Sequence, residues 1–537
     1  MSRWPGQDLL LIHPPAAKPA EPPLGMASLL GHLRGHGFTV AALDANLEAY
    51  LYLLETSRLE GALGPSPSRA LQRAVRHARS SLDLLRSPES LQSFARYSTA
   101  VHHLNQALSV YNGEGGRERL TLGDYQHGDL SEFSPADLDR AAAGEVSTLF
   151  APYFREQVLP QLEEQRPRWV ALSVNYRHQV LPAFELAGMI RRQLPDIGLV
   201  GGGGMFTSWK PFLQQGRQRF TCFDHIGFGP GEAVLGRLLD GPNPAGAYDL
   251  EDSSAIAFTP DYSFAPFARY LSPVPVLPLA ASRGCYWQKC LFCPEATSPT
   301  HPWAAVGDAD FVPWLLELSA RYGTGHLHLS DNAIPPRLLR AMAARADEMA
   351  ALRWHGFVRF EKALLDPHLV QDLAAGGCRL LQLGLESGSQ AVLDRLGKGT
   401  RLTDVSAILR NLQRAGIATY VYIMLGTPGE TEADAEATRR FLEEHAEAVT
   451  FLNVAIMNLP RQSEMLTRPD DFGIEGARLP ADRESLGLYE TFQASSGWGR
   501  REARRFLQQR LLASPAVRAM VNRVPPLFTS SHAFLFC

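Results

Sequence analysis

The sequence predicts an α/β protein with a doubly wound, Rossmann-like first domain and a partial (β/α)6 barrel as its second. Strand-length apolar runs alternate with amphipathic helical segments in two series along the chain, and a purely helical stretch interrupts the first series. A chain of 537 residues is also too long for one ordinary core. The expected parts are a first domain at 1–245 with a helical insertion at about 50–150, a linker at 246–275, the barrel at 276–475 and a helical C-terminal region at 476–537.

Composition narrows the class of protein. Hydrophobic residues make up 45% of the chain and charged residues 20%, as in soluble globular proteins. The formal net charge of −4 argues against a dominant nucleic-acid surface. No apolar run approaches the roughly 20 residues of a spanning helix, and the N-terminal apolar run is too short for a secretory signal. Six cysteines in 537 residues do not suggest a disulfide framework, so a cytoplasmic location is expected.

The first series opens with "DLLLIHPP" and "PLGMASLLGHLRGHGFTVAALDAN", a β-α-β unit. It continues after the insertion with "RWVALSVNY", "IGLVGGGG" and "FDHIGFGPGEAVLGRLLDG". Ligands of doubly wound sheets lie outside the carboxyl ends of the strands. Here those ends are "HPPAAKPAEPPLG", "SVNYRHQ", "GGGGMF" and "GFGPGEA", loops that suit close backbone approach by a large flat ligand.

The second series contains six strand-like segments, from "VPVLPLAASRG" to "VTFLNVAIMNLP", with helical segments between them. Six repeats are too few for a complete eight-stranded barrel. We therefore expect an open barrel of six strands.

Three cysteines, Cys285, Cys290 and Cys293, follow the first barrel strand with C-x4-C-x2-C spacing. Thiolates are soft ligands for zinc or for iron-sulfur clusters. A structural zinc takes four protein ligands, usually as two pairs, and no second pair is present. Cys222 and Cys378 are expected to be buried small side chains. The pattern favours a four-iron cluster with one open iron, and zinc is the alternative.

Several motifs together resemble the radical S-adenosylmethionine (SAM) superfamily, and specifically its cobalamin-binding branch. They are "SRGC" with the cysteine loop, "GLESGSQAVLDRLGKG", "IMLGTPGETEAD" and the opening "PPLGMASLLGHLRGHGFTVAALDAN". The resemblance covers roughly residues 5–475 apart from the insertion. One departure is the first cysteine gap, which has four residues where the superfamily usually has three.

The resemblance implies that Cys285, Cys290 and Cys293 are the metal-binding and catalytic residues. They would hold a [4Fe-4S] cluster whose unique iron chelates the amino and carboxylate groups of SAM. Tyr286 and Trp287, inside the loop, would exclude solvent or touch the adenine, with plain packing as the alternative.

Further SAM-binding candidates follow later barrel strands. Asp331 is the candidate for the methionyl amine or the substrate, although "SDN" matches the usual GGE-like motif poorly. Arg359 would meet a carboxylate or the substrate, or else form a surface salt bridge. Glu386 and Ser387 would contact the ribose or the methionyl end of SAM. The remaining candidates are Gly426 and Gly429, which would approach the adenine or simply form a turn. Lys398 is not a candidate, and a helix cap or a surface pair is expected for it.

The first domain is expected to bind cobalamin. It lacks the D-x-H-x-x-G motif that supplies a histidine to cobalt, so the resemblance implies base-off cobalamin without a protein histidine ligand. The candidate cobalamin-binding residues are Pro14, Leu24, Gly25, Ser173, Asn175, Gly202, Gly203, Gly229 and Glu232.

The implied activity is methylation of an unactivated carbon of a natural product, peptide or lipid, through methylcobalamin and a 5′-deoxyadenosyl radical. Rearrangement, cyclisation or oxidation without net methylation is the alternative, and a non-catalytic cobalamin- or cluster-binding sensor is a third possibility. An external electron donor of the flavodoxin or ferredoxin type is expected, whereas nucleic acid is not.

Overall fold

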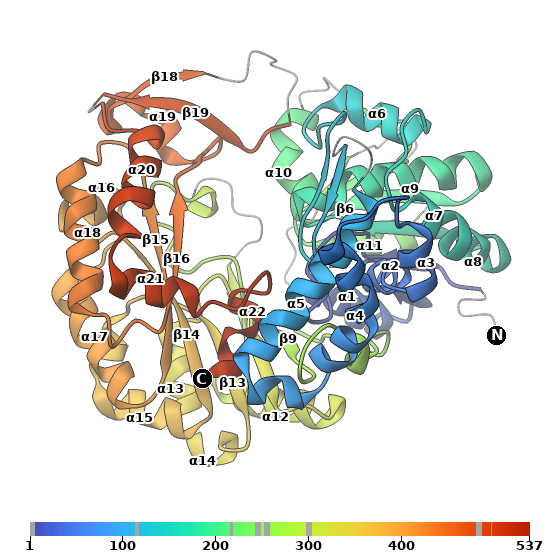
Figure 1. The fold of residues 1–537 in the computed structure, drawn as a ribbon. Helices are drawn as coiled ribbons and strands as arrows, with labels where there is room; N and C mark the ends of the chain where they lie inside the picture. Colours follow the sequence, from blue (N-terminus) through green and yellow to red (C-terminus); the bar gives the residue numbers. More distant parts are fainter. Residues whose placement is uncertain are drawn as a thin grey trace. The chain divides into compact units, whose positions relative to one another are not determined.

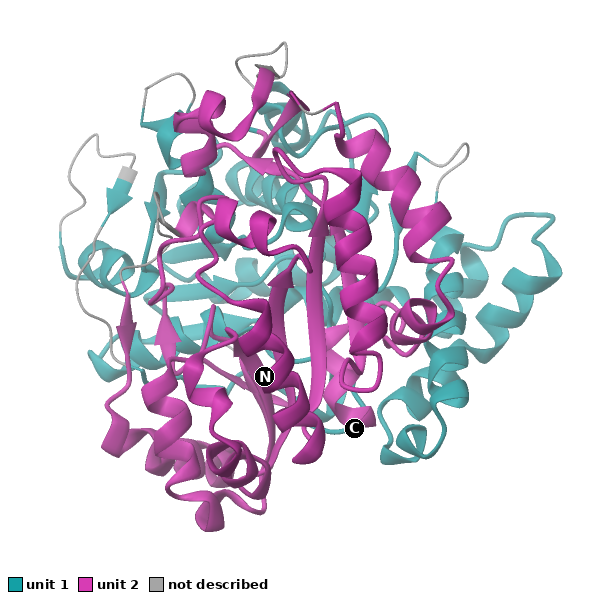
Figure 2. Ribbon diagram, turned by 90° about the vertical axis from the view of Figure 1, so that its left-hand side faces the viewer, with its two compact units in different colours: residues 1–275, 484–486 teal, residues 276–483, 487–537 magenta. Residues whose placement is uncertain are grey.

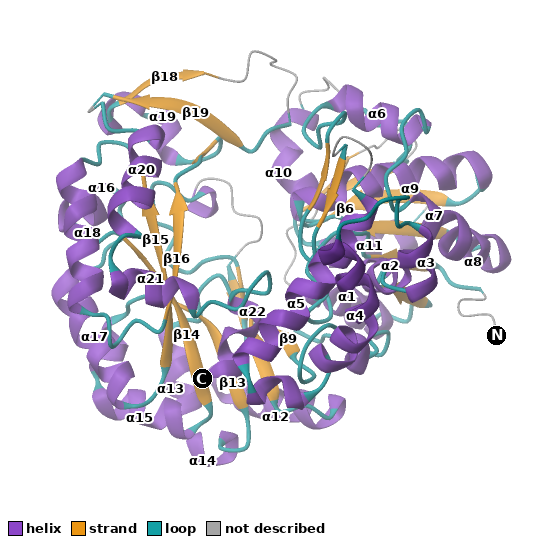
Figure 3. Cartoon of the chain, in the orientation of Figure 1, coloured by secondary structure: helices purple, strands orange, loops and turns teal. Residues whose placement is uncertain are grey.

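The computed structural model describes residues 6–112, 117–214, 219–241, 249–251, 258–296, 303–478, 486–495 and 497–537. The chain forms two compact units, residues 1–275 with 484–486 and residues 276–483 with 487–537 (Figure 2). Each unit alternates strands and helices around its own parallel sheet (Figure 3). The predicted α/β class is confirmed.

The sheet of the first unit has six parallel strands in the order β2-β1-β5-β6-β7-β8. Its strands are β1 (Leu9–Ile12), β2 (Val40–Leu43), β5 (Trp169–Ser173), β6 (Gly198–Gly202), β7 (His225–Phe228) and β8 (Asp249–Glu251). The order reverses at β1 and β5, which is the topological switch point of a doubly wound fold. The loops predicted to receive a ligand follow β1, β5, β6 and β7 and therefore share one edge of this sheet.

Helices cover both faces of this sheet (Figure 1). They are α1 (Leu24–Gly35), α9 (Val180–Gln193), α10 (Gly204–Leu213) and α11 (Gly231–Asp240). Leu9 and Val200 face α1 and α11 in one buried cluster. Because successive strand residues point to opposite faces, Gly201 faces the other side. There, a Cβ on Gly201 would lie 2.8 Å from the Phe206 ring of α10.

A mainly helical insertion connects β2 to β5. Its helices are α2 (Ala45–Leu53), α3 (Thr56–Gly61), α4 (Arg69–Leu85), α5 (Phe94–Leu108), α6 (Pro135–Ala143), α7 (Ala151–Tyr153) and α8 (Leu159–Gln165). The two longest of these helices bury apolar side chains, at Val75 and Leu82 in α4 and at Val101 and Leu108 in α5. The insertion also contains an antiparallel hairpin, β3 (Glu118–Leu120) with β4 (Tyr125–His127), which the sequence analysis did not predict.

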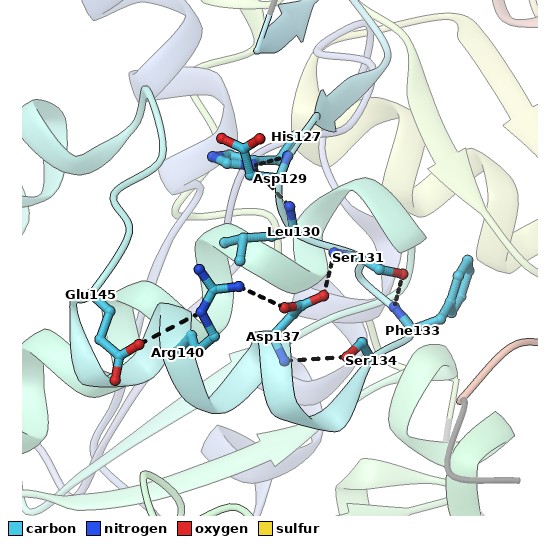
Figure 4. A network of polar contacts seen from close by, with 9 residues as sticks. All are labelled: His127, Asp129, Leu130, Ser131, Phe133, Ser134, Asp137, Arg140 and Glu145. Carbon is cyan, nitrogen blue, oxygen red and sulfur yellow. Dashed lines mark hydrogen bonds and ion pairs between the residues drawn. The ribbon is translucent and has the colours of Figure 1, made fainter. Parts of the chain in front are cut away.

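Short-range polar contacts order the segment between that hairpin and α6 (Figure 4). Ser134 caps the helix by accepting from the Asp137 backbone N–H at 3.3 Å. The Asp137 carboxylate accepts from the Ser131 N–H and pairs with Arg140 at 3.0 Å. After β4, His127 Nδ1 accepts from two backbone N–H groups of the connecting turn. The insertion thus has its own polar scaffold.

The segment 246–275, expected as a linker, belongs to the first unit. It contributes β8 to the sheet. Asp261 pairs with Arg34 of α1 at 2.9 Å, and Tyr270 donates to the buried Asp44 at 2.8 Å.

The second unit contains six parallel strands whose order in the sheet is their order in the chain. They are β9 (Leu277–Leu279), β12 (His326–Leu329), β13 (Arg353–Val358), β14 (Cys378–Glu386), β15 (Ala418–Leu425) and β16 (Phe451–Ile456). This sequential order is that of a (β/α) barrel and confirms the predicted partial barrel.

Helices connect consecutive barrel strands (Figure 1). They are α12 (Asp308–Tyr322), α13 (Pro336–Ala343), α14 (Ala346–Met349), α15 (Pro367–Ala375), α16 (Gln390–Arg395), α17 (Leu402–Arg414) and α18 (Glu432–Glu444). After β9, the chain forms a two-residue strand, β10 (Ser282–Arg283), which pairs with β11 (Ala304–Ala305).

The region after the barrel is only partly as predicted. Helices were expected from 476, but β18 (Ile474–Arg478) and β19 (Tyr489–Ala494) form an antiparallel sheet with β17 (Leu459–Pro460). The helices around this sheet and beyond it are α19 (Glu464–Thr467), α20 (Arg500–Phe506), α21 (Pro515–Asn522) and α22 (Ser530–Ala533). Within the described ranges, no helix has the length and apolar character needed to cross a bilayer.

Candidate active site

The cysteine loop leaves the sheet of the second unit directly after β9 and β10. Its first gap turns at Gln288, whose φ of 50° lies in the left-handed region that side chains other than glycine seldom adopt. Its second gap is a tight turn in which the Cys293 N–H donates to the Cys290 carbonyl at 3.0 Å. The four-residue first gap is therefore accommodated by one left-handed residue.

Each of the three cysteines of the loop is half-buried. Burial raises the pKa of Cys290, and burial raises that of Cys293 to about 11. The charges of Cys290 and Cys285 raise the pKa of Cys293 further. The three sulfurs do not meet at one point: among the described residues, no three His, Cys, Asp or Glu side chains are placed to hold a single metal ion.

Arg359, directly after β13, connects the cysteine loop to the rest of the barrel. Its side chain is 6% exposed, so it is not the surface salt bridge considered from the sequence. Its Nη1 donates to Cys290 Sγ at 3.7 Å and its Nη2 to the Lys398 carbonyl at 2.6 Å. Its Nε donates to Glu361 at 3.0 Å. All three nitrogens are therefore engaged.

Tyr286 and Trp287 both pack within the second unit. Tyr286 donates to Glu361 at 2.7 Å. The Trp287 ring lies 4.1 Å from the Arg359 guanidinium carbon, a cation–π contact. On Gly399, a Cβ would lie 2.3 Å from the same ring, so this glycine allows the indole to pack closely. Roles for either side chain toward SAM stay predictions.

Glu386 ends β14 with φ of 68° and pairs with Lys398 Nζ at 2.7 Å. The two side chains are only 14% and 7% exposed. The expectation that Lys398 caps a helix or pairs at the surface is wrong, because the segment after α16 turns it inward. Contact between Glu386 and SAM stays a prediction.

Two other candidates have structural partners. Asp331, 4% exposed, accepts from the Ala281 N–H at 3.1 Å and from the Ser282 hydroxyl. Burial raises its pKa to about 6. Ser387 Oγ lies 3.1 Å from the Thr438 hydroxyl. Asp331 thus connects the end of β12 to the strand that precedes the cysteines.

The "GTPGE" loop after β15 is organised by a residue that the sequence analysis did not single out, Glu430. Its carboxylate is fully buried and accepts from the N–H groups of Gly426 at 2.6 Å and Thr427 at 2.9 Å. Burial raises its pKa to about 7. Gly426 and Gly429 have φ of 77° and 73°, so the turn itself requires glycine, and approach to the adenine stays a prediction.

In the first unit, hydrogen bonds of Asn175 and Gln179 connect the loops at the switch point. Asn175 donates to Ser173 Oγ at 3.1 Å and accepts from the Gly204 N–H at 3.0 Å. Gln179 donates to the Pro14 carbonyl at 2.6 Å and accepts from the Asn175 N–H. Gln179 was also missed from the sequence, although "SVNYRHQ" contains it.

Glycines shape this edge of the sheet. Gly203 has φ of 103°, and a Cβ there would lie 2.5 Å from the Val174 carbonyl oxygen. At Gly25, a Cβ would meet nothing within 4 Å, so the start of α1 is open. The other candidates at this edge are half-buried Leu24, Gly202 and Gly229 and buried Glu232.

A comparison with protein families finds a match for part of the second unit. Residues 280–442 match the family model of the Radical SAM superfamily. Residues 280–442 therefore form a radical SAM domain.

Curated relatives match only in part. One is the bacteriochlorophyllide d C-12(1)-methyltransferase of Chlorobaculum tepidum, 29% identical over 198 residues, which are 34% of this chain and 41% of that protein. Another is an uncharacterized methyltransferase of Pyrococcus horikoshii, 24% identical over 34% of this chain and 40% of that protein. The chain thus spans about two fifths of the length of these relatives.

Solved structures match over most of the chain. TsrM from Kitasatospora setae, a radical SAM methyltransferase with tryptophan substrate and a SAM analogue bound, covers 96% of this chain and 91% of its own. Its TM-score is 0.57 at 17% identity. The cobalamin-dependent radical SAM enzyme OxsB, with aqua-cobalamin and SAM bound, has a TM-score of 0.53 at 14% identity and covers 88% and 56%. The resemblance to the cobalamin-binding branch is thereby confirmed in fold.

Proposed function

We propose that this chain is a cobalamin-dependent radical SAM enzyme that methylates an unactivated carbon of a natural product, peptide or lipid. One observation carries the proposal. A unit with three cysteines after the first strand of a six-stranded barrel sheet is joined to a unit with a glycine-rich switch-point edge. When bound, the cluster with SAM supplies a radical that removes hydrogen from the substrate, and cobalamin supplies the methyl group.

The donor set of the second unit fits a cluster with one iron open to SAM. The loop offers three thiols, while Cys378 is buried at the start of β14 and Cys537 is the last residue. A cysteine must lose its proton to bind iron. Burial raises the pKa of Cys290, whereas the charges of Lys398 and Arg359 lower it and so favour the thiolate. The chain's part is to hold these thiolates and exclude water around them.

The switch-point edge of the first unit fits a flat ligand. The backbone at Gly203 has no room for a side chain, and the start of α1 at Gly25 is open. We propose base-off binding without a histidine ligand. In support, His13 is 4% exposed with its Nε2 3.2 Å from Gln179 Nε2, and His178 Nδ1 lies 2.9 Å from the Asp124 carboxylate.

Reduction of the cluster requires an external electron donor, and we propose a flavodoxin or ferredoxin.

Product analysis tests the proposal. The chain is reconstituted anaerobically with iron, sulfide and cobalamin, then incubated with SAM, a reductant and a candidate substrate. Methyl transfer predicts both 5′-deoxyadenosine and S-adenosylhomocysteine. 5′-Deoxyadenosine alone would favour rearrangement or oxidation. The absence of both products would contradict an enzymatic role. Cys537→Ala removes a thiol outside the cysteine loop. It is the matched control for substitutions of the loop cysteines and should form both products.

A further inference from the structure

We propose that Arg359 is a positioning residue that raises the reduction potential of the cluster, through an N–H···S hydrogen bond and its charge on Cys290. The inference rests on the proposed function, which assigns Cys290 as a cluster ligand.

The geometry holds the guanidinium in one orientation. Its planar fork directs different nitrogens in fixed directions. Because Nε is held by Glu361 and Nη2 by the Lys398 carbonyl, Nη1 is directed at Cys290 Sγ, 3.7 Å away. The Trp287 ring, 4.1 Å from the guanidinium carbon, covers one face of the group. The donor is therefore preorganised, and no rearrangement is needed to meet the sulfur.

The electrostatics give the direction of the effect. Cluster reduction adds one negative charge, and hydrogen bonds to cluster sulfurs help to set the reduction potential. Arg359 is 5% exposed, so water screens its charge poorly and it stabilises the reduced cluster more than the oxidised one. The counter-charge of Glu361 is bound at Nε, a different nitrogen from the one that meets the sulfur.

Lysine could not replace this arrangement. An ammonium group is a point charge without the fork that engages three partners at once. Arg359→Lys should keep the charge and lose the directed N–H···S bond, whereas Arg359→Gln loses both. The two variants therefore separate charge from orientation.

The test is a redox titration of the full chain loaded with cluster, without SAM or substrate, followed by electron paramagnetic resonance. At fixed potential, Arg359→Gln should lower the ratio of reduced to oxidised cluster about tenfold, or about 59 mV for one electron. Arg359→Lys should shift it in the same direction by less. Arg353→Gln is the matched control, because it removes the same charge from the other end of β13, where Arg353 donates to backbone carbonyls. It should leave the midpoint unchanged.

Two outcomes would overturn the inference. One is an unchanged midpoint in Arg359→Gln at wild-type iron content. If Arg359→Gln holds less iron than the wild type, the midpoint of Arg359→Lys is compared with the wild type instead. An unchanged midpoint in Arg359→Lys is then the second outcome that would overturn the inference. The reduced wild-type cluster should also show an exchangeable-proton coupling that Arg359→Gln lacks, which a purely structural role would not produce. A wild-type chain without any four-iron cluster would instead contradict the proposed function.

Discussion

Lys398 Nζ donates to Glu386 Oε1 across 2.7 Å, and the two side chains are 7% and 14% exposed. Removing one partner of such a pair leaves a poorly hydrated charge without its counter-charge. Substitution of either residue should therefore lower the stability of the second unit. Lys398 also lowers the pKa of Cys290, and Glu386 raises it.

We expect Lys398→Met to lower the free energy of unfolding by about 3 kcal/mol, because Glu386 keeps its charge in a buried place. Denaturant titration of the full chain measures the change. Adding Glu386→Gln should recover part of the loss. Arg79→Ala, which breaks a pair with 75% and 57% exposure, should cost less than about 0.5 kcal/mol. Equal costs for the two single variants would refute this interpretation.

Gly203→Ala should disrupt the edge of the first unit. The new Cβ would lie 2.5 Å from the Val174 oxygen at φ of 103°, so we expect a loss of about 2 kcal/mol or more and at least tenfold weaker cobalamin binding. Titration with hydroxocobalamin, followed by absorbance, measures the affinity. In α11, Gly236 has nothing within 4 Å, and Gly236→Ala should leave binding unchanged. Wild-type affinity in Gly203→Ala would show that the glycine does not shape the ligand edge.

Glu430 predicts a specific pH dependence of stability. Burial raises its folded pKa to about 7, above the ordinary 4.5, so the folded chain binds more protons than the unfolded chain between these values. The contribution of Glu430 to the free energy of unfolding is therefore fully present below pH 4.5. It falls as the pH rises to 7, by about 3 kcal/mol in total. Glu430→Gln should remove that fall. Unfolding curves across this range check it, and identical slopes for both proteins would exclude the effect.

Local sequence patterns were sufficient for much of this architecture. The six barrel strands and the cysteine loop after β9 follow from periodicity and spacing within short windows. The burial of Lys398 could not be predicted from such patterns, because it depends on Glu386, twelve residues earlier, and on how the segment after α16 turns. Glu430 and Gln179 act on backbone groups, which spacing does not reveal. The alternation in "YETFQA" is typical of a strand and could have identified β19, although the segment after it has a helical pattern.

The most direct test of the account is the iron and sulfide content of the anaerobically reconstituted chain. The wild-type chain and the matched control Cys222→Ala, whose thiol is buried in the first unit, should each hold about four irons and four sulfides. The triple variant Cys285→Ala, Cys290→Ala, Cys293→Ala should hold essentially none. Full iron content in the triple variant would contradict the assignment of these cysteines and, with it, the proposed radical chemistry.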